Sequence, residues 1–475
     1  MDKWINETKL GEKVTWDPYP ISRRVVNWII TLCFFDKHSL SNEKFLKKVK
    51  SSLIQQTNFL YNNLELDLQN NHLTSNAKAL IWSGVILKGY HDSDKWFKKG
   101  YKIFKKRVRD EIQSDGFQNE NSSSYHMVTI QDYLETILLL KANDKKVPEG
   151  LLDILEKMFE ALQSILKPDG SIPLLNDSIT NYPMNASELM AVGALIFNKS
   201  DFKWSFKESE MNYLAWIFGN EGLEDFISLP KIEPDYKSVA LKDTGFYVMK
   251  NGWDEHSTYL LFNCSDISPR HCPGHGHADA LSFELYAKGQ TIMMDPGVYS
   301  YHDKKYRYYF KSTKNHNTVI VDGKDQSEIL GSFRFGKIAE IKPLNWIKSV
   351  ESDLVSAQHN GYKDVIHKRS IEFNKKDLFI INDIIEGYGT KNIDLVFNMG
   401  SKLKDLELIK DNKCICIFDK CRVTLEITTN KIWGKFRIED GWISEEWNKL
   451  QKNKKIIYSV YEELPIKIKT KIYIE

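Results

Sequence analysis

Long apolar runs are absent from this chain of 475 residues, and no segment approaches the ~18 apolar residues that a membrane-spanning helix requires. A secretory signal is not visible either, because the start, MDKWINETKLGEKVTW, lacks a basic stretch followed by an apolar run. We therefore expect no membrane span. Without a signal, the sequence predicts either a cytoplasmic protein or a chain that lacks its natural N-terminus.

An excess of one charge is also missing. The formal net charge is only +2 and the charged residues are mixed along the chain, which argues against nucleic acid as a partner, because nucleic-acid-binding proteins concentrate positive charge. Cysteines are few, and their spacing gives no disulfide framework: Cys33, Cys264, Cys272, Cys414, Cys416 and Cys421. Cys414 and Cys416 alternate on one strand face, where buried thiols are favoured over a metal site.

The residues that are abundant describe a globular protein. Hydrophobic residues make up 42% and charged residues 27%, which excludes a disordered chain. A length of 475 residues exceeds one ordinary core and predicts two domains. The 12 Trp and 22 Tyr suit sugar binding, in which flat rings stack on pyranose faces, although large cores also use aromatic residues.

Apolar residues in the first half recur every three to four positions, which predicts helices. These helices are expected at residues 23–35, 43–64, 74–90, 95–112, 128–143, 150–166, 187–197 and 211–219. Three irregular loops interrupt them, at residues 68–76, 114–126 and 167–183. Loops on a rigid helical frame are where chemistry tends to lie.

The composition changes near residues 230–243, and strand patterns follow from Gly245 onward. Strands are expected within residues 245–252, 257–264, 280–295, 317–323, 370–384, 392–400, 414–418, 422–429 and 456–463. Turn signals such as Lys-Asn-Gly and Asp-Gly separate them, as in an antiparallel sandwich. The sequence therefore predicts an α+β chain with a helical domain over residues 1–235 and an all-β domain over residues 240–475.

Candidate site residues concentrate between residues 271 and 325. His275, His277 and Asp279 alternate, so they would share one face of an extended segment. Asp295 ends the apolar run TIMMDPG, and His316 precedes the β-branched run NTVIVDG. Two histidines and a carboxylate form a credible zinc ligand set, and nearby tyrosines suit proton transfer. Taken singly, each of these residues is more often structural.

Two motifs in this region, HGHADALSFELYAKGQTIMMDPGVYSY and RYYFKSTKNHNTVIVDGKDQS, resemble the signature of the heparinase II/III-like C-terminal domain. Three N-terminal motifs, WDPYPISRRVVNWI, NNHLTSNAKALIWSG and DGFQNENSSSYH, are similar to the helical domain of these polysaccharide lyases and of related alginate lyases. The resemblance implies an incomplete α/α toroid joined to an antiparallel β-sandwich, with the active site in the cleft between them. It also implies β-elimination on a uronate-containing polysaccharide, and a location in the periplasm or cell envelope.

The resemblance assigns catalytic roles to matching positions. Asn71 matches the asparagine that neutralises the uronate carboxylate, and His72 shares its loop. Tyr125 matches the catalytic tyrosine, which removes the C5 proton and protonates the leaving oxygen. His275 matches the histidine that assists neutralisation or serves as the alternative base. A second tyrosine is expected near the metal; we choose Tyr301 over the competing Tyr299, Tyr306, Tyr308 and Tyr309.

The resemblance also places a zinc ion, regarded mainly as structural, on His277, Asp295 and His316. The spacing of 18 residues between His277 and Asp295 suits adjacent strands joined by a hairpin. Arg270 and Arg307 are candidates for binding the substrate carboxylate, although a surface arginine is the favoured account of each, and Lys311 shares that ambiguity.

Two other functions remain open at this point. A non-catalytic glycan-binding or polysaccharide-assembly protein could retain the fold, but the intact set of Asn71, Tyr125 and His275 argues against it. Family members carry additional helical sequence ahead of WDPYP. This chain has little sequence there, which argues for the non-catalytic protein. A zinc hydrolase is disfavoured because the sequence has no His-Glu-x-x-His motif. The sequence does not indicate which glycan is cut or the oligomeric state.

Overall fold

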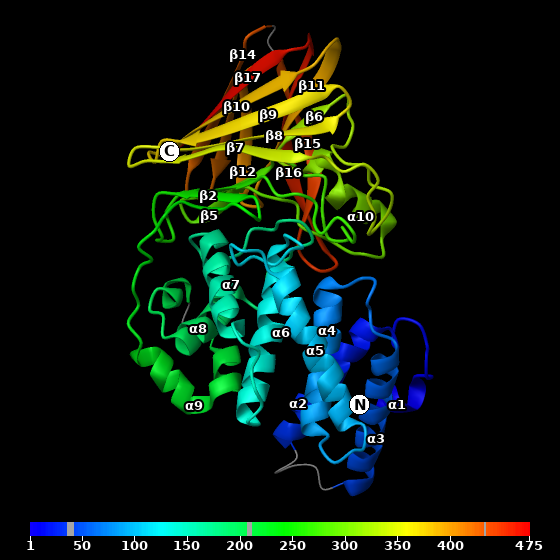
Figure 1. Ribbon diagram of the computed structural model, residues 1–475. Helices are drawn as coiled ribbons and strands as arrows, with labels where there is room; N and C mark the ends of the chain where they lie inside the picture. Colours follow the sequence, from blue (N-terminus) through cyan, green and yellow to red (C-terminus); the bar gives the residue numbers. More distant parts are fainter. Residues whose placement is uncertain (36–41, 207–210, 432–433) are drawn as a thin grey trace. The chain divides into compact units, whose positions relative to one another are not determined.

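The computed structural model describes residues 1–35, 42–206, 211–431 and 434–475 (Figure 1). The chain forms two compact units. The first comprises Met1–Ile112 and Val128–Leu155, and the second comprises Gln113–Met127 and Glu156–Glu475. The domain boundary that the sequence predicts between residues 235 and 240 stays a prediction.

Helices occupy the N-terminal part of the chain, as the apolar spacing predicts. Their bounds are α1 Asp2–Glu7, α2 Pro18–Phe35, α3 Glu43–Asn62, α4 Asn70–Ile86, α5 Ser93–Glu111, α6 Ser123–Ala142, α7 Leu151–Ile165, α8 Ala186–Phe197 and α9 Asn212–Ser228. In α2 the residues Ile21, Val25 and Ile29 are buried at four-residue spacing, so they form one face. This face joins α3, α4 and α5 in the apolar core of the first unit.

Three local expectations are wrong. Helix α4 begins at Asn70, so most of the predicted loop at 68–76 is helical. Helix α6 begins at Ser123, which places Tyr125 in its first turn rather than in a loop. The tyrosines at residues 299–309, which the sequence also suggested as strand residues that pack, lie partly in a helix, α10, Lys304–Lys311. Its N-cap, Asp303, accepts hydrogen bonds from two backbone N–H groups of the first turn, and this local cap outweighs the strand preference of the tyrosines.

Strands from residue 239 onward form three antiparallel sheets in the part of the chain that the structure describes. The first sheet has the order β1-β2-β3-β4-β5, the second β12-β13-β14-β17-β10-β9-β8-β7, and the third β15-β16-β11-β6. The bounds are β1 Val239–Leu241, β2 Phe246–Lys250, β3 Tyr259–Asn263, β4 Phe283–Ala287, β5 Gln290–Met293, β6 Val319–Val321, β7 Ile341–Lys348, β8 Asp353–Tyr362, β9 Val365–Phe373, β10 Leu378–Glu386, β11 Thr390–Asn398, β12 Leu403–Lys410, β13 Lys413–Phe418, β14 Arg422–Thr429, β15 Lys435–Glu446, β16 Lys449–Glu463 and β17 Ile466–Ile474.

All three sheets contribute to one apolar core. In β9 and β10 every second side chain is buried, because successive residues of a strand point to opposite faces. Phe262 of the first sheet, Phe379 of the second and Leu395 of the third belong to this core. The predicted order of helices followed by antiparallel sheets is therefore confirmed. Both cysteines predicted to share a face of β13, Cys414 and Cys416, are buried in the core.

Several strands were not predicted, namely β1, β7, β8, β12, β15 and β17. Strands β7 and β12 are the edges of the second sheet and are largely exposed, so they lack an alternating apolar pattern. Strand β17 does alternate, with Ile466, Ile468 and Ile472 buried, and its signal was present in the sequence.

Among the helices within the described residues, none has the length and apolar content that crossing a membrane requires.

Candidate active site

Polar side chains from separate segments meet in the second unit. They come from the first turn of α6, from the loop at residues 167–183, from the irregular segment before β4, from the residues after β5 and from α10. The loop before α6 is fastened to the first sheet by Asp115, whose carboxylate accepts hydrogen bonds from the backbone N–H groups of Asp243 at 2.9 Å and Thr244 at 2.8 Å. Ser124, next to Tyr125, donates from its backbone N–H to Ser178 Oγ at 3.2 Å and from its hydroxyl to the Ile179 carbonyl at 3.1 Å, so contacts within this unit fix the start of α6.

Two tyrosines and a histidine form the first part of the site. The hydroxyls of Tyr125 and Tyr301 lie 2.8 Å apart, and the Tyr301 hydroxyl lies 3.4 Å from Nδ1 of His275. The Tyr125 ring stacks on the His275 ring, with centroids 3.8 Å apart and planes at 25°. The structure thus brings together three of the predicted catalytic residues in an arrangement through which protons can move between hydroxyl and imidazole groups.

A buried carboxylate that the sequence motifs did not indicate, Asp177, lies at the centre of the cluster. Its Oδ2 lies 2.9 Å from Nδ1 of His275, and its Oδ1 lies 2.9 Å from Nε2 of His277. Burial raises the pKa of Asp177, but Arg307 and the two histidines outweigh burial and hold that pKa well below its ordinary value. Asp177 is therefore an anion that connects the histidine beside the tyrosines with a predicted metal ligand.

Arg307 is buried and directs its guanidinium group at Asp177. Both terminal nitrogens donate to this carboxylate, Nη2 at 2.8 Å, and Nη2 also donates to the Gly274 carbonyl at 2.9 Å. Nε donates to the Ser332 carbonyl at 2.8 Å. Lys311, one turn further along α10, is also buried, and burial together with Arg307 lowers its pKa to about 7. The structure thus gives Arg307 an internal partner, while its predicted role in substrate binding stays a prediction.

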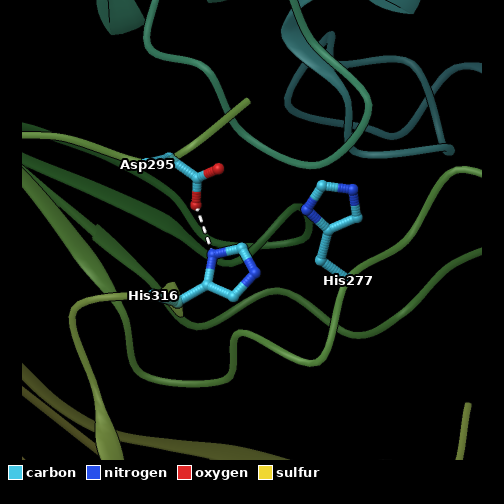
Figure 2. Close-up of side chains that lie close together, drawn as sticks. All are labelled: His277, Asp295 and His316. Carbon is cyan, nitrogen blue, oxygen red and sulfur yellow. Dashed lines mark hydrogen bonds and ion pairs between the residues drawn. The ribbon is translucent and has the colours of Figure 1, made fainter. Parts of the chain in front are cut away.

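The predicted metal ligands converge (Figure 2). His277, Asp295 and His316 are all buried, and each offers one ligand atom such that these atoms lie within 4.8 Å of one another. Nδ1 of His316 lies 2.7 Å from Oδ2 of Asp295, and Figure 2 shows a ring nitrogen of His277 turned toward the other two side chains. The cluster has the composition of a site for a divalent metal ion.

The partners of the ring nitrogens support this interpretation. Nδ1 of His277 is buried and has no hydrogen-bond partner, whereas its Nε2 is held by Asp177. In His316, Nε2 lies 3.0 Å from the carbonyl of Phe310, so the ring is oriented with Nδ1 toward Asp295. A ligating histidine commonly donates its other N–H group to a carboxylate or a carbonyl, and both histidines have this arrangement. A metal ion would satisfy the bare nitrogen of His277.

Protonation in this cluster follows from burial and from the neighbouring charges. Burial lowers the pKa of His277 to about 4, although Asp177 opposes the shift. Burial also lowers the pKa of His316, but the Asp295 carboxylate outweighs it and the net pKa is raised. Burial raises the pKa of the nearby Asp279 to about 7. A neutral His277 has the protonation state that a metal ligand requires.

The predicted geometry of these segments is partly wrong. His275, His277 and Asp279 do not share a strand face, because the residues before β4 are irregular. The predicted hairpin does exist: β4 and β5 are antiparallel neighbours, and Asp295 follows β5 directly. His277, however, precedes β4 instead of lying in it. The glycines and Pro273 of HCPGHGH explain the irregular backbone, since neither residue type favours a strand interior.

Two of the predicted catalytic residues belong to the first unit. Asn71 is buried in the first turn of α4. The ring of His72 stacks on Tyr19, with centroids 4.5 Å apart, and its Nδ1 lies 2.9 Å from Glu65 Oε1. That both residues join the Tyr125 cluster stays a prediction.

The remaining predicted substrate-binding residue, Arg270, is in the second unit. Its side chain is 53% exposed, and its terminal nitrogen lies 3.5 Å from Asp266.

A second carboxylate, Glu120, was also missed by the sequence reading; its Oε2 lies 3.4 Å from Nε2 of His275. Asn176, beside Asp177, accepts a hydrogen bond from the His277 backbone N–H at 3.0 Å. The available signal was the pair Asn176–Asp177 in the irregular loop at residues 167–183, where the pair follows the apolar stretch IPLL. Loop residues of this kind carry function more often than residues within helices or strands.

Comparisons with known protein families identify the same two regions that the motifs indicate. The model described as heparinase II/III-like, C-terminal, matches residues 233–471. The model described as heparinase II/III N-terminus matches residues 3–204. Together the matches span most of the chain, and the C-terminal match alone covers half of it.

Curated relatives carry the description heparin-sulfate lyase. The protein from Pedobacter heparinus is 26% identical over 404 residues, which is 82% of this chain and 56% of the relative. The protein from Bacteroides thetaiotaomicron is 25% identical over 407 residues, which is 81% of this chain and 54% of the relative. The chain therefore spans about half the length of the curated relatives it matches.

Solved structures share the fold. A crystal structure of heparinase III superposes with a TM-score of 0.84 at 20% identity, covering 100% of this chain and 72% of that one. The heparan sulfate lyase from Pedobacter heparinus gives a TM-score of 0.71 at 22% identity, covering 100% of this chain and 71% of that one. At these identities the likeness concerns the fold alone.

Proposed function

Because this chain belongs to the heparinase II/III-like family, we propose that it is a polysaccharide lyase that cleaves a uronate-containing acidic glycan by β-elimination. The observation that carries the proposal is the cluster in which the Tyr125 and Tyr301 hydroxyls lie 2.8 Å apart beside His275. The curated relatives described as heparin-sulfate lyases make heparan sulfate the first substrate to test.

Tyr125 is the proposed acid and base. It would remove the C5 proton of the uronate as a phenolate and return a proton to the departing glycosidic oxygen. Burial and the Asp177 carboxylate raise the pKa of Tyr301 well above its ordinary value, so Tyr301 keeps its proton. A protonated Tyr301 can donate a hydrogen bond to the Tyr125 oxygen, which favours the charged form of Tyr125.

His275 has a supporting role in this scheme. Its ring stacks on Tyr125, and its Nδ1 lies 3.4 Å from the Tyr301 hydroxyl and 2.9 Å from Asp177. This position supports exchange of a proton with Tyr301, or assistance in neutralising the substrate carboxylate. The internal partners of His275 hold its ring in one orientation.

Neutralisation of the uronate carboxylate is needed because it makes the adjacent C5 proton acidic. Asn71 is the proposed donor for this step, and His72 shares its segment. An amide can donate hydrogen bonds to a carboxylate oxygen without gaining a charge itself. Arg270, whose side chain is 53% exposed, is available for a further contact with a carboxylate.

The proposal includes one zinc ion held by His277, Asp295 and His316. The buried Nδ1 of His277 without a partner and the carbonyl behind His316 support it. The chemistry that zinc supplies there is structural cross-linking of the segment before β4, the residues after β5 and the residues before β6. Asp177 then lies between the metal ligand His277 and the tyrosine partner His275, and it orients both rings.

The test is incubation of the purified protein with heparan sulfate and with a panel of other uronate polysaccharides, followed by ultraviolet detection of the unsaturated product. β-Elimination leaves a carbon–carbon double bond conjugated with the carboxylate, so absorbance should rise with time on at least one glycan. Hydrolysis of a glycosidic bond gives reducing ends without this absorbance, and that result would contradict a lyase. A protein that binds a uronate glycan but produces neither signal would instead be a glycan-binding protein.

A further inference from the structure

Partly exposed aromatic rings adjoin Tyr301. The Trp447 ring centroid lies 4.8 Å from that of Tyr301, and the Phe333 centroid lies 5.2 Å from it. Tyr182 makes an edge contact with Trp447, with centroids 6.5 Å apart. These three residues come from separate loops of the second unit, and we call them the aromatic platform.

Backbone hydrogen bonds fix the hairpin that carries Trp447. Trp447 lies in the turn between β15 and β16, followed by Asn448 with a φ of 60°. The Asn448 N–H donates to the Tyr299 carbonyl at 2.9 Å, and the Glu445 carbonyl accepts from the Thr180 N–H at 2.8 Å. The hairpin tip is therefore tied both to the residues after β5 and to the loop that carries Tyr182.

The backbone just before Phe333 is held by two buried basic side chains of the site. The preceding carbonyl, Ser332, accepts hydrogen bonds from Arg307 at 2.8 Å and from Lys311 at 3.2 Å. The Arg307 guanidinium carbon also lies 5.4 Å from the Phe333 ring centroid. The Phe333 ring nevertheless remains 45% exposed. The protein thus positions a large apolar ring next to the site without covering it.

The chemistry of this surface matches one kind of ligand. Flat aromatic rings favour the apolar C–H face of a pyranose ring, and the adjacent Tyr125 and Tyr301 hydroxyls can hydrogen-bond its polar edge. A purely apolar ligand would make no hydrogen bond to these hydroxyls, and a small anion would leave the rings exposed to water. Trp447 and Phe333 both contact the Tyr301 ring, so an occupant of the platform would lie next to one of the proposed catalytic residues.

We propose that Trp447, Phe333 and Tyr182 form the binding subsite for the sugar ring next to the bond that is cleaved. The subsite stacks a hexopyranose unit of the acidic glycan and places its linkage beside the hydroxyl pair. The proposal rests on the lyase function proposed above. It assigns the platform to binding and leaves the proton transfer to Tyr125.

The test compares Trp447→Ala, Trp447→Phe and Phe333→Ala with the wild type and with a control, Trp216→Ala. Trp216 lies on α9 and is 52% exposed, so its substitution removes an exposed indole elsewhere in the same unit. We expect KM for the cleaved glycan to rise roughly 10-fold in Trp447→Ala and in Phe333→Ala, while kcat changes less than about 3-fold. Trp447→Phe should restore most of the affinity, and the control should match the wild type.

Direct binding separates this proposal from the proposed function. Heparan sulfate oligosaccharide binding is measured by titration calorimetry for the same variants, with thermal unfolding as the check on folding. If the wild type binds without cleaving, a roughly 10-fold loss of affinity in Trp447→Ala, but not in Trp216→Ala, supports the platform while the lyase proposal fails. Folded Trp447→Ala and Phe333→Ala proteins with wild-type affinity and KM would overturn the platform. A wild type that neither binds nor cleaves any glycan tested would overturn it as well.

Discussion

Two buried clusters in the second unit combine histidine, aspartate and arginine, yet they differ in how completely their hydrogen bonds are satisfied. One is the candidate site around Asp177. The other, here the core network, consists of His359, His367, Arg369 and Asp383 on β8, β9 and β10. Nε2 of His367 lies 2.7 Å from Asp383, and Nε of Arg369 donates to the same oxygen at 2.7 Å.

Every ring nitrogen of the core network has a partner. Nε2 of His359 lies 3.1 Å from Nδ1 of His367, and Nδ1 of His359 accepts from the Gly361 N–H at 3.0 Å. In the candidate site, by contrast, the buried Nδ1 of His277 has no partner. The candidate site also borders half-exposed aromatic rings, whereas the members of the core network are all buried.

Residue types alone therefore do not identify a functional site. A histidine–aspartate–arginine cluster with complete hydrogen bonding cross-links a core, because it has no donor or acceptor left for a ligand. A cluster with an unsatisfied nitrogen and access to solvent can accept one. The core network also reaches the candidate site, since Arg369 Nη1 donates to the carbonyls of Leu281 and Asn317, both at 2.8 Å.

The largest effect is expected from Asp383→Ala in the core network. The change leaves the Arg369 guanidinium buried without its carboxylate, so the free energy of unfolding should fall by about 3–5 kcal/mol. The control is Asp440→Ala, which removes an exposed partner of Lys454 and should cost less than about 1 kcal/mol. Both are measured by urea denaturation. Equal losses in the two variants would show that the core network is not a structural cross-link.

The next effect is expected from His277→Ala. We expect the purified wild type to contain one zinc ion and the variant to lose it, with a fall in stability of about 2.7 kcal/mol if zinc is present at 100 times its Kd. Metal analysis and thermal unfolding with and without a chelator measure both quantities. His359→Ala is the matched control, since it should destabilise the protein while keeping the metal. A wild type without zinc, whose unfolding a chelator does not change, would refute the metal site.

A smaller effect is expected from acid pH on the core network. Burial raises the pKa of Asp383, but Arg369 and His367 outweigh it and lower the pKa to about 2. Because the folded pKa lies below the unfolded value, this group contributes stability above about pH 4 that is lost as the pH falls toward 2. The contribution is about 2 kcal/mol. The stability difference between wild type and Asp383→Asn should therefore shrink between pH 5 and pH 2, and a constant difference would contradict the assignment.

The smallest effect on stability is expected from Arg270→Ala. The side chain is 53% exposed and its contact with Asp266 is 3.5 Å, so the free energy of unfolding should change by less than about 0.5 kcal/mol. If Arg270 binds the substrate carboxylate, KM should rise roughly 3-fold and the rise should weaken at high salt. An unchanged KM would leave Arg270 as an ordinary surface residue.

Much of the candidate site could be predicted from sequence because its residues lie in short, recognisable motifs. His277, Asp295 and His316 were predicted as one group, and their ligand atoms lie within 4.8 Å of one another. Tyr125 and Tyr301 were predicted separately, and their hydroxyls form a hydrogen bond. What the motifs could not supply was local geometry, such as the helical start of α6 at Ser123.

Asp177 and the core network escaped prediction for a different reason. Asp177 is paired with Arg307, which lies 130 residues away in the sequence, and no local pattern connects the two. His367 and Arg369 occupy inward-facing positions of β9, where the alternating pattern predicts apolar residues. These polar residues can be buried because Asp383 of the paired strand β10 lies opposite Arg369. Contacts between distant segments are what sequence spacing does not encode.

The acid and base role of Tyr125 is tested by the turnover of Tyr125→Phe on the glycan that the wild type cleaves. The change removes the hydroxyl that bonds to Tyr301 but keeps the ring that stacks on His275, so the melting temperature should change little. If Tyr125 is the acid and base, kcat should fall by roughly 10²-fold or more, as measured by the ultraviolet absorbance of the unsaturated product. A Tyr125→Phe protein with wild-type kcat would contradict the account.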